Sequence, residues 1–446
     1  MLKRKAEKKI VDWIDTGKNA LLVSGARQVG KTYCIRECLK QCKADCLEVN
    51  LINNPELIEV FDNSKTVRDL EVNLSLAFGY KFTKGKSILF IDEVQECSDI
   101  VTKIKFWVDE GSYKYILSGS LLGIELKDIR SVPVGYMDEI TMYPMDFEEF
   151  LWASDVNSDS LDYIRECYDD RKELSEIVHQ KMLQLFRRYI VVGGMPAAVQ
   201  EYVQSNDMNR VSEIQENIIS QYRRDCTKYE TEDKKLMIRA VFDAIPSQLL
   251  KQNRRFNYAD VKKGLRFERL EDSFLWLESA GIAIGVYNAT EPKIALEQNK
   301  KSSLLKLYLS DVGLLSESYG SSFKLNVLMD NGESNLGGLY ENVVAQELTA
   351  HGYKAYYYNS HRNGELDFVV EHKGYILPIE VKSGKDYKVH SAISNVTLND
   401  EFQIRESIVF SNYNISTEGK FLYLPVYMCF LLDDDVVLPY LDKIEL

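Results

Sequence analysis

The sequence predicts an α/β protein with several domains, and three observations support this class. In the first third of the chain, short apolar strands alternate with helical segments, and the first strand leads into a glycine-containing turn. Between Asp146 and Leu250, apolar residues recur mainly at helical spacing. On both sides of Lys373-Gly374, apolar and polar residues alternate with period two, which is typical of a β-hairpin with a tight turn.

The length and composition fit this organisation. A chain of 446 residues is too long for one hydrophobic core and should divide into several domains. An apolar content of 45% and a charged content of 28% are ordinary for globular proteins, and the net charge of -13 disfavours a surface that coats nucleic acid throughout. We expect four regions, at residues 1–150, 151–235, 236–315 and 316–446.

Neither membrane insertion nor secretion is predicted. No apolar run approaches the roughly 18 residues that span a bilayer, and the first residues, MLKRKAEKKIVDWI, lack the apolar core of a signal peptide. We therefore expect a cytoplasmic protein with no membrane partner. The eight cysteines form no CxxC pair, and Cys34, Cys38, Cys42 and Cys46 recur every four residues. This spacing favours core-facing residues along a helix over a zinc site.

A phosphate-binding loop follows the first strand. The strand Ala20 to Ser24 runs into GARQVGKT, which fits the pattern G-x-x-x-x-G-K-[ST], and a helical segment comes next. The glycines let backbone N–H groups wrap phosphates, Lys31 reaches the β and γ phosphates, and the Thr32 hydroxyl ligates Mg²⁺. The predicted cofactors are therefore ATP and Mg²⁺. The loop residues expected to bind the nucleotide are Gly25, Ala26, Arg27, Gln28, Val29, Gly30, Lys31 and Thr32.

Two further strands carry polar residues at their carboxyl ends. SILFIDE ends in Asp92, expected to hold Mg²⁺ through water, and Glu93, expected to orient or deprotonate the attacking water. The alternative is an acidic turn without a catalytic role. YKYILSGS contains Ser118, at the position of a γ-phosphate sensor, although this serine could instead cap the next turn. With CLEVNL and YMDEITMYPM, these strands predict a five-stranded parallel P-loop ATPase core that has an extra strand between the two nucleotide-binding strands.

The middle of the chain is predicted to be helical, basic and, towards its end, a winged helix. FNYADVKKGLRFERLEDSFLWLESAGIAIGVYNA fits a helix, a turn, a recognition-like helix from Arg266 to Ala280 and a strand, and the wing strands would begin at Ile282 and Leu304. Basic doublets could touch phosphates or lie on a solvated face; they are Arg223-Arg224, Arg254-Arg255 and Lys262-Lys263. One of Arg130, Arg223 or Arg224 could instead act as an arginine finger.

The C-terminal hairpin predicts an unusual pair of carboxylates. If Lys373-Gly374 forms the turn, Phe368 faces Ile379 and Asp367 faces Glu380. Like charges directly opposite each other destabilise a sheet by up to about 1 kcal/mol, so a cation or a catalytic role should offset the repulsion. Upstream, GGLYENVVAQELTAHG has the apolar spacing of a helix that carries Glu341.

The order of these acids resembles the PD-(D/E)XK nuclease superfamily. The carriers are a helix with an acid, a strand with Asp367, and then Glu380-x-Lys382 on the partner strand. The resemblance implies that Asp367 and Glu380, with Glu341 nearby, chelate one or two Mg²⁺ ions at a scissile phosphate. It also implies that Lys382 helps to hold the attacking water as hydroxide. The C-terminal region is thus expected to be an α/β restriction-endonuclease-like domain.

Taken whole, the chain resembles a family of bacterial and archaeal AAA-type ATPases that carry a C-terminal restriction-endonuclease-like domain of unknown function. The carriers are GARQVGKT, FIDE, LSGS, YIVVGGMPA, KLYLSDVGLL, LYENVVAQEL and the segments ELDFVV and IEVKSGK. The chain departs from this family at Gly135-Tyr136, where such relatives usually have Gly-Arg, and Arg130 is a possible substitute. The resemblance implies ring assembly, and hence a homo-oligomer.

These observations leave three functions open. The first is an ATP-hydrolysing protein whose nuclease-like domain cuts or grips nucleic acid, DNA rather than RNA. The second is a nucleotide-controlled regulator whose nuclease-like domain is an inactive scaffold, which the overall acidity favours because a nuclease for long DNA usually has a cationic groove. The third is an interaction platform whose ATP only stabilises the fold. Glu93 argues against this last reading, because a protein that does not hydrolyse ATP needs no carboxylate to activate water.

Overall fold

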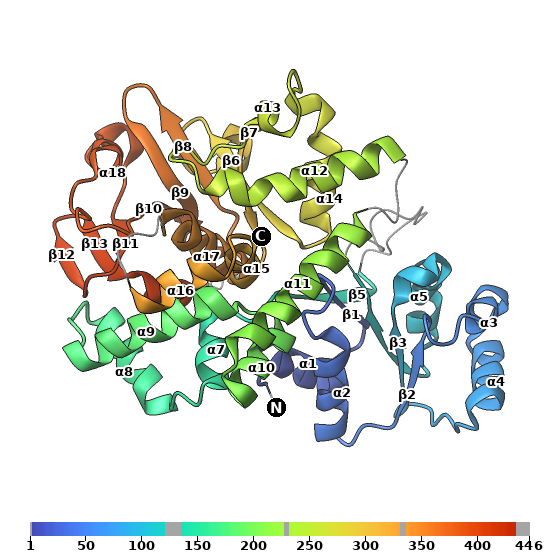
Figure 1. Cartoon of the computed structure of the whole chain (residues 1–446). Coiled ribbons are helices and arrows are strands. Elements are labelled where there is room, and N and C mark those ends of the chain that lie inside the picture. Colours follow the sequence, from blue (N-terminus) through green and yellow to red (C-terminus); the bar gives the residue numbers. More distant parts are fainter. Residues whose placement is uncertain (1, 121–134, 227–231, 331–335, 434–446) are drawn as a thin grey trace, which may run out of the picture. The chain divides into compact units, whose positions relative to one another are not determined.

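The computed structural model describes residues 2–120, 135–226, 232–330 and 336–433. The chain divides into two compact units, each made from several stretches of sequence (Figure 1). Unit 1 contains residues 1–145, 195–200 and 275–282. Unit 2 contains residues 146–194, 201–274 and 283–446. The helices α10 (Pro196–Ser205) and α14 (Glu271–Ser279) contain residues of both units.

Unit 1 is built on a five-stranded parallel sheet with the strand order β2-β3-β4-β1-β5. Every residue of β1 and of β3 is buried, as expected for parallel strands that are covered on both faces. The strand β4 lies between β1 and β3, so the predicted extra strand is confirmed. The strands are β1 (Ala20–Gly25), β2 (Cys46–Asn50), β3 (Ile88–Asp92), β4 (Lys114–Ser118) and β5 (Met137–Met142).

Helices cover both faces of this sheet, and the alternation of side chains along β3 separates two apolar clusters. Ile88 and Phe90 pack with residues of α1 and α2, whereas Leu89 and Ile91 pack with residues of α3, α4 and α5. The helices are α1 (Lys5–Thr16), α2 (Lys31–Gln41), α3 (Leu57–Asn63), α4 (Val67–Phe78), the short 3-10 turn η1 (Val94–Glu96) and α5 (Ser98–Glu110).

The expectation for the cysteines is confirmed in part. Cys34 and Cys38 are buried in the apolar cluster beneath α2, as a core-facing helical stripe requires. Cys42 is the residue that caps the end of α2, and Cys46 lies on β2 instead of the helix, because the turn after Gln41 ends the helical repeat. All eight cysteines are free thiols.

Unit 2 begins with a group of helices, as predicted for the middle of the chain. Their apolar sides pack together through aromatic rings, with Phe147 against Phe186 and Tyr189, and Phe150 against Tyr202. The helices are α7 (Phe147–Ala153), α8 (Ser158–Asp169), α9 (Glu176–Val192), α11 (Met208–Asp225) and α12 (Glu232–Leu249). No helix of the described residues is long and apolar enough to cross a membrane.

An eight-stranded mixed sheet forms the rest of unit 2, with the order β12-β13-β11-β10-β9-β8-β6-β7. Its strands are β6 (Ala283–Ala289), β7 (Lys300–Leu309), β8 (Tyr356–Ser360), β9 (Gly364–His372), β10 (Tyr375–Val381), β11 (Ser407–Ser411), β12 (Ser416–Glu418) and β13 (Phe421–Pro425). The helices between them are α15 (Val312–Ser318), α16 (Ser321–Met329), α17 (Gly337–Ala350) and α18 (Ser391–Thr397). α17 is buried along nearly its whole length.

The predicted hairpin has the predicted register. β9 and β10 are antiparallel, and Phe368 pairs with Ile379 while Tyr375 pairs with His372. Lys373 and Gly374 form the turn with φ values of 47° and 82°, the left-handed conformation that two-residue hairpin turns require. The alternation of apolar and polar residues therefore predicted both the pairing of the two strands and the face on which each side chain lies.

The segment predicted as a winged helix differs from the expectation. β6 and β7 do form an antiparallel pair, but β6 also pairs with β8, so these strands lie in the sheet that contains the C-terminal hairpin. The region expected to be one helix from Arg266 to Ala280 is a 3-10 turn, η2 (Phe267–Arg269), followed by α14, and the preceding helix α13 (Tyr258–Val261) is a single turn. The boundary expected at residue 315 falls within unit 2.

Candidate functional site

The glycine-containing loop connects the carboxyl end of β1 to the first residue of α2. Gly25 has a φ of 142°, and a Cβ at this position would lie 2.2 Å from the Met142 carbonyl oxygen of the neighbouring strand. Gly30, with a φ of 92°, precedes the first helical residue, Lys31. Only glycine satisfies both the conformation and the close backbone approach at Gly25, so the loop can turn directly from the strand into the helix.

A residue far upstream holds this loop in place. The Arg4 guanidinium donates from Nη1 to the Val29 carbonyl at 2.7 Å and from Nη2 to the Tyr143 carbonyl at 2.7 Å. Arg4 is buried, which is uncommon for arginine. Sequence analysis missed Arg4, because it is one of several basic residues in a charged N-terminal segment and no local pattern distinguishes it.

Polar side chains from three strands and one helix meet at the carboxyl edge of the sheet. The Thr32 hydroxyl donates to Asp92 at 3.0 Å to Oδ1 and 3.1 Å to Oδ2, and Ser118 donates to Oδ1 of the same carboxylate. Asn50 Nδ2 donates to Asp92 Oδ2 at 2.8 Å. Asn50, Asp92 and Ser118 are register partners on neighbouring strands, which explains why they converge. Asn50 ends CLEVN, and sequence analysis did not select it.

Lys31 and Glu93 lie beside this group. The Lys31 ammonium donates to the carbonyls of Gly25 at 3.0 Å and of Ala26 at 2.8 Å, within its own loop. Burial lowers the pKa of Lys31 to about 8, although the charges of Glu93 and Asp92 oppose this shift. Glu93 has a φ of 60°, a conformation that is unusual for a side-chain-bearing residue, and it accepts a hydrogen bond from the Gln95 amide.

The second predicted site lies in unit 2, where its acids come from a helix and two strands. Glu341 projects from α17, Asp367 from β9 and Glu380 from β10, and Lys382 follows β10. Asp367 Oδ2 accepts a hydrogen bond from the Val381 N–H at 3.0 Å. Glu380 Oε1 forms an ion pair with Lys382 Nζ at 2.7 Å, so these two residues of the E-x-K motif are direct partners.

A buried lysine from another strand lies among the carboxylates of this site. Lys306 Nζ, from β7, lies 3.1 Å from Glu365 Oε1, 3.3 Å from Asp367 Oδ1 and 3.7 Å from Glu341 Oε2. Its side chain is 1% exposed. Sequence analysis missed this role for Lys306, although KLYLSDVGLL was among the segments that carry the family resemblance. The only local signal is a lysine at an apolar-rich position of a strand.

Arginines from the doublet before β6 also face these acids. Arg254 forms an ion pair with Glu341 Oε1, and the Tyr308 hydroxyl donates to Glu341 Oε2 at 2.8 Å. Arg255 Nε lies 3.3 Å from Glu365 Oε2. The doublet was expected to touch phosphates or to lie on a solvated face. Both arginines instead neutralise carboxylates of this site.

The pKa values of the buried acids shift in opposite directions. Burial raises the pKa of Glu341 to about 7, with a further contribution from Asp367, against the opposing charges of Lys306 and Arg254. Burial and then Asp367 raise the pKa of Glu380 to about 8. Burial also opposes ionisation of Asp367, but Lys306 and the Val381 N–H outweigh it and lower the pKa of Asp367. Asp367 is therefore the most readily ionised of these three acids.

The predicted metal ligands do not converge on one point. Within the described part of the chain, the carboxylates of Glu341, Asp367 and Glu380 do not form a group whose ligand atoms all lie within 4.8 Å. The physical reason is that the Lys306 ammonium lies between Glu341 and Asp367. Glu380 Oε2, however, is buried and has no hydrogen-bond partner among the described residues.

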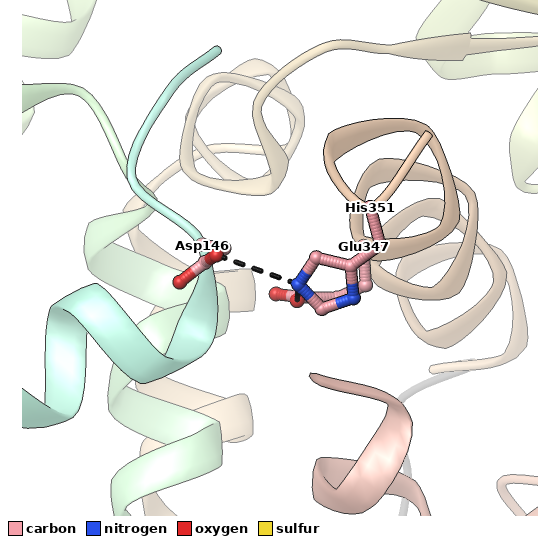
Figure 2. Close-up of side chains that lie close together, drawn as sticks. All are labelled: Asp146, Glu347 and His351. Carbon is pink, nitrogen blue, oxygen red and sulfur yellow. Dashed lines mark ion pairs between the residues drawn. The ribbon is translucent and has the colours of Figure 1, made fainter. Parts of the chain in front are cut away.

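One other group of possible ligands does lie within 4.8 Å: Asp146, Glu347 and His351 (Figure 2). His351 Nε2 is 3.6 Å from Asp146 Oδ2 and 3.9 Å from Glu347 Oε2, and its Nδ1 is 2.7 Å from the Leu432 carbonyl oxygen. Asp146 is the N-cap of α7, and Glu347 Oε1 accepts the N–H of the first residue of that helix at 2.7 Å. The two acids therefore cap a helix, and sequence analysis identified neither role.

The arginines considered as possible arginine fingers have different surroundings. Arg223 forms an ion pair with Asp243 at 2.7 Å. Arg224 is in the last turn of α11, where a positive charge complements the helix dipole. Arg130 lies outside the described residues. Which arginine, if any, contacts a neighbouring nucleotide stays a prediction.

Three family models match separate segments of the chain, each shorter than half of it. Residues 17–151 match an AAA domain. Residues 183–323 match a domain of unknown function, DUF8612, and residues 336–427 match another, DUF4143. No curated protein matches the chain.

Solved structures show weak overall similarity. The Walker-type ATPase PABY2304 of Pyrococcus abyssi has 14% identity and a TM-score of 0.42, with 72% of this chain and 96% of that chain covered. The Orc1 protein of Aeropyrum pernix in complex with DNA has 14% identity and a TM-score of 0.29, over 74% of this chain and 95% of that one. Cdc6p from Pyrobaculum aerophilum has 10% identity and a TM-score of 0.27, over 74% and 96%. These scores do not establish a shared overall fold.

The family match and the sheet agree on the N-terminal region. Residues 17–151 contain the strand, loop and helix that form the phosphate-binding turn, and the strand that ends in Asp92. The match to DUF4143 assigns no activity to the C-terminal region. Residues 17–151 are therefore an AAA-type P-loop domain built on a five-stranded parallel sheet.

Proposed function

We propose that unit 1 binds ATP together with Mg²⁺ and hydrolyses it. The observation that carries this proposal is the contact of the Thr32 hydroxyl with Asp92, which brings the loop motif and the acidic end of β3 together. A hydroxyl and a carboxylate are oxygen ligands of the kind that Mg²⁺ prefers, so the residues fit the ion. When bound, the ion neutralises charge on the β and γ phosphates.

The residues of this site have separate roles in the proposal. The N–H groups from Gly25 to Thr32 hold the phosphates at the start of α2, where the helix dipole favours negative charge. Lys31 exchanges its loop carbonyls for the β and γ phosphates, whose charge favours the protonated ammonium. Glu93 orients or deprotonates the attacking water, and Ser118 senses the γ phosphate.

Substitution of Lys31 tests this site. Lys31→Ala should reduce ATP binding and hydrolysis at least tenfold, because the loop loses its phosphate-facing charge. Lys40→Ala is the matched control, since Lys40 is an exposed residue of the same helix and pairs with Glu37. Equal ATP binding and turnover in the wild type and Lys31→Ala, measured on the full chain, would refute a P-loop nucleotide site.

We further infer that unit 2 acts on or binds nucleic acid, DNA rather than RNA, through Asp367, Glu380 and Lys382. The buried Glu380 Oε2 lacks a protein partner among the described residues and lies in a hairpin with the charged Asp367, so these two acids fit a single Mg²⁺ ion. When bound, the ion stabilises charge on a scissile phosphate. Lys382, held by Glu380, would keep the attacking water deprotonated.

A specific observation also favours the second function, a nucleotide-controlled regulator with an inactive nuclease-like scaffold. Lys306 lies where Glu341 and Asp367 would otherwise share a cation. An internal ammonium of this kind neutralises the acids without any metal ion. If the protein is a regulator of this kind, it should bind nucleic acid without cleaving it.

Cleavage assays separate these two functions. Single- and double-stranded DNA and RNA would be incubated with the full chain and Mg²⁺ or Mn²⁺, with and without ATP. Cleavage that disappears in Asp367→Ala but persists in Asp386→Ala, an exposed acid of the loop after β10, supports a nuclease. Binding without cleavage supports the regulator, and the absence of both would refute a nucleic-acid function for these substrates.

A further inference from the structure

We propose that the Lys306 ammonium is the permanent cation of the Glu341 and Asp367 carboxylates. On this account a divalent metal ion binds only at Asp367 and Glu380, so the site holds one metal ion and never two. The inference rests on the metal-binding site proposed above and specifies its composition. It also explains why the acids predicted to share metal ions are held apart.

Every carboxylate oxygen on the Glu341 side already has a partner. Glu341 Oε1 pairs with Arg254, and Glu341 Oε2 accepts from the Tyr308 hydroxyl at 2.8 Å and lies 3.7 Å from Lys306 Nζ. Asp367 Oδ1 is 3.3 Å from the same Nζ. A metal ion between Glu341 and Asp367 would have to occupy the position of the ammonium.

Burial keeps the Lys306 ammonium at this position. The side chains of Lys306 and Glu341 are each 1% exposed, and Lys306 extends from the interior of a strand, so it cannot turn towards solvent without breaking its three ion pairs. Removing a buried charge from its partners leaves both sides unpaired in a low-dielectric environment. Exchange of Lys306 for a metal ion is therefore unfavourable.

The acidic and basic side chains of this site are matched in number. Glu365 and Glu380 have their own basic partners, Arg255 at 3.3 Å and Lys382 at 2.7 Å. Lys306 pairs with Asp367, and Arg254 pairs with Glu341. Four acids therefore face four basic groups. Each divalent ion adds two positive charges to a site whose described acids are already matched, so a second ion is disfavoured more strongly than the first.

One carboxylate oxygen of this site differs from the others. Glu380 Oε2 is buried and has no hydrogen-bond partner among the described residues, although Oε1 of the same carboxylate pairs with Lys382. A proton or a cation must satisfy this atom. The geometry therefore leaves room for one metal ion, on the Glu380 side of Asp367.

Counting bound Mn²⁺ ions tests the inference. Mn²⁺ would be titrated into the full chain without nucleotide, with free Mn²⁺ followed by electron paramagnetic resonance and folding by circular dichroism. Mn²⁺ that binds elsewhere contributes equally to all variants, so the differences report on this site. We expect Lys306→Met to bind one more ion than the wild type, and Lys306→Met combined with Glu341→Gln to lose that additional ion.

A matched control uses another buried lysine of unit 2. Lys324 pairs with Glu317 and with Gln215, so Lys324→Met also removes a buried ammonium, but one that forms an ion pair with a single carboxylate. We expect no additional Mn²⁺ in this variant. An increase equal to that of Lys306→Met would mean that loss of any buried lysine creates a metal site, and it would overturn the proposal.

Two further outcomes decide the proposal. A folded Lys306→Met that binds no more Mn²⁺ than the wild type overturns it. If Lys306→Met does not fold, Glu341→Gln in the wild-type background decides instead: an unchanged number of ions supports the proposal, and the loss of one ion overturns it, since Glu341 would then be a ligand. Glu380→Gln examines the proposed function separately, because an unchanged count there refutes metal binding at Asp367 and Glu380.

Discussion

The Thr32 hydroxyl lies 3.0 Å from Asp92 Oδ1, across 60 residues of sequence. Thr32 is the second residue of α2, and Asp92 is the last residue of β3, separated from β1 by β4. Their contact joins the phosphate-binding loop to the acidic strand end, and Asn50 and Ser118 complete the group. Two motifs that sequence analysis recognised independently therefore form one site.

Replacement of Gly25 should disrupt this site. In Gly25→Ala the new Cβ would meet the Met142 carbonyl oxygen at 2.2 Å, and the φ of 142° would be strained, so we expect a loss of about 3 kcal/mol or more of stability together with loss of ATP binding. The matched control is Gly85→Ala, with a φ of 73° and open space around the site. It should cost only about 1 kcal/mol. Thermal unfolding measures the loss of stability in each variant. Equal losses in the two variants would contradict the steric explanation.

Removal of Arg254 should destabilise unit 2 because Glu341 would remain buried without one of its two basic partners. We expect Arg254→Met to lower the free energy of unfolding by about 3–5 kcal/mol. The double variant Arg254→Met with Glu341→Gln should recover part of this loss, since the buried carboxylate that lost Arg254 is then neutral. A double-mutant cycle by urea unfolding measures the coupling, and additive losses would contradict a direct pair.

The stability of unit 2 should depend on Asp311 between pH 4 and pH 6. Asp311 is fully buried and accepts hydrogen bonds from the N–H groups of Gly194 at 2.5 Å and Leu314 at 2.9 Å. Burial raises its pKa from 3.8 to about 6, so the folded state binds the proton more tightly than the unfolded state. The contribution of Asp311 to the free energy of unfolding is fully present below pH 4. It falls by roughly 3 kcal/mol in total as the pH rises to about 6.

Comparison with Asp311→Asn isolates this effect. The difference in unfolding free energy between the wild type and the variant should change by roughly 3 kcal/mol between pH 4 and pH 7, with the wild type relatively less stable at the higher pH. Urea unfolding of unit 2 at both pH values measures it. A difference that does not vary with pH would mean that the pKa of Asp311 is not raised.

A substitution in the hairpin turn should stabilise unit 2. Lys373 has a φ of 47°, a conformation in which asparagine is more favourable than lysine, and Gly374 already follows it. We expect Lys373→Asn to raise the unfolding free energy by about 0.5 kcal/mol. This net value includes the small loss of the exposed ion pair between Lys373 and Asp433. Chemical unfolding measures this change, and a loss of more than 1 kcal/mol would contradict it.

The elements predicted correctly are those with local signals. The loop pattern, the apolar strands of unit 1 and the alternation around Lys373-Gly374 each lie within a short stretch of sequence. The hairpin register followed because a slip of one residue would move Phe368 to the polar face and Asp367 to the apolar face. The same reasoning placed Glu341, Asp367 and Glu380 on their correct elements.

The features that were missed depend on contacts between distant segments. Lys306 meets Asp367 only because β7 and β9 belong to one sheet, with β6 and β8 between them. Periodicity identifies a strand but does not identify its neighbours in a sheet. Arg4 and Asn50 similarly act on residues far along the chain. The sequence therefore predicted acids in need of a cation, but the structure was required to find the lysine among them.

The most direct test of the central claim is ATP hydrolysis by Glu93→Gln. Steady-state turnover with Mg²⁺ and the affinity for ATP would be measured on the full chain, with Glu96→Gln, three residues further along, as the matched control. We predict that Glu93→Gln binds ATP as the wild type does and loses at least 100-fold in turnover, whereas Glu96→Gln retains turnover, as general-base contributions of roughly 10²–10⁴ imply. Unchanged turnover in a folded Glu93→Gln variant would contradict the proposed mechanism.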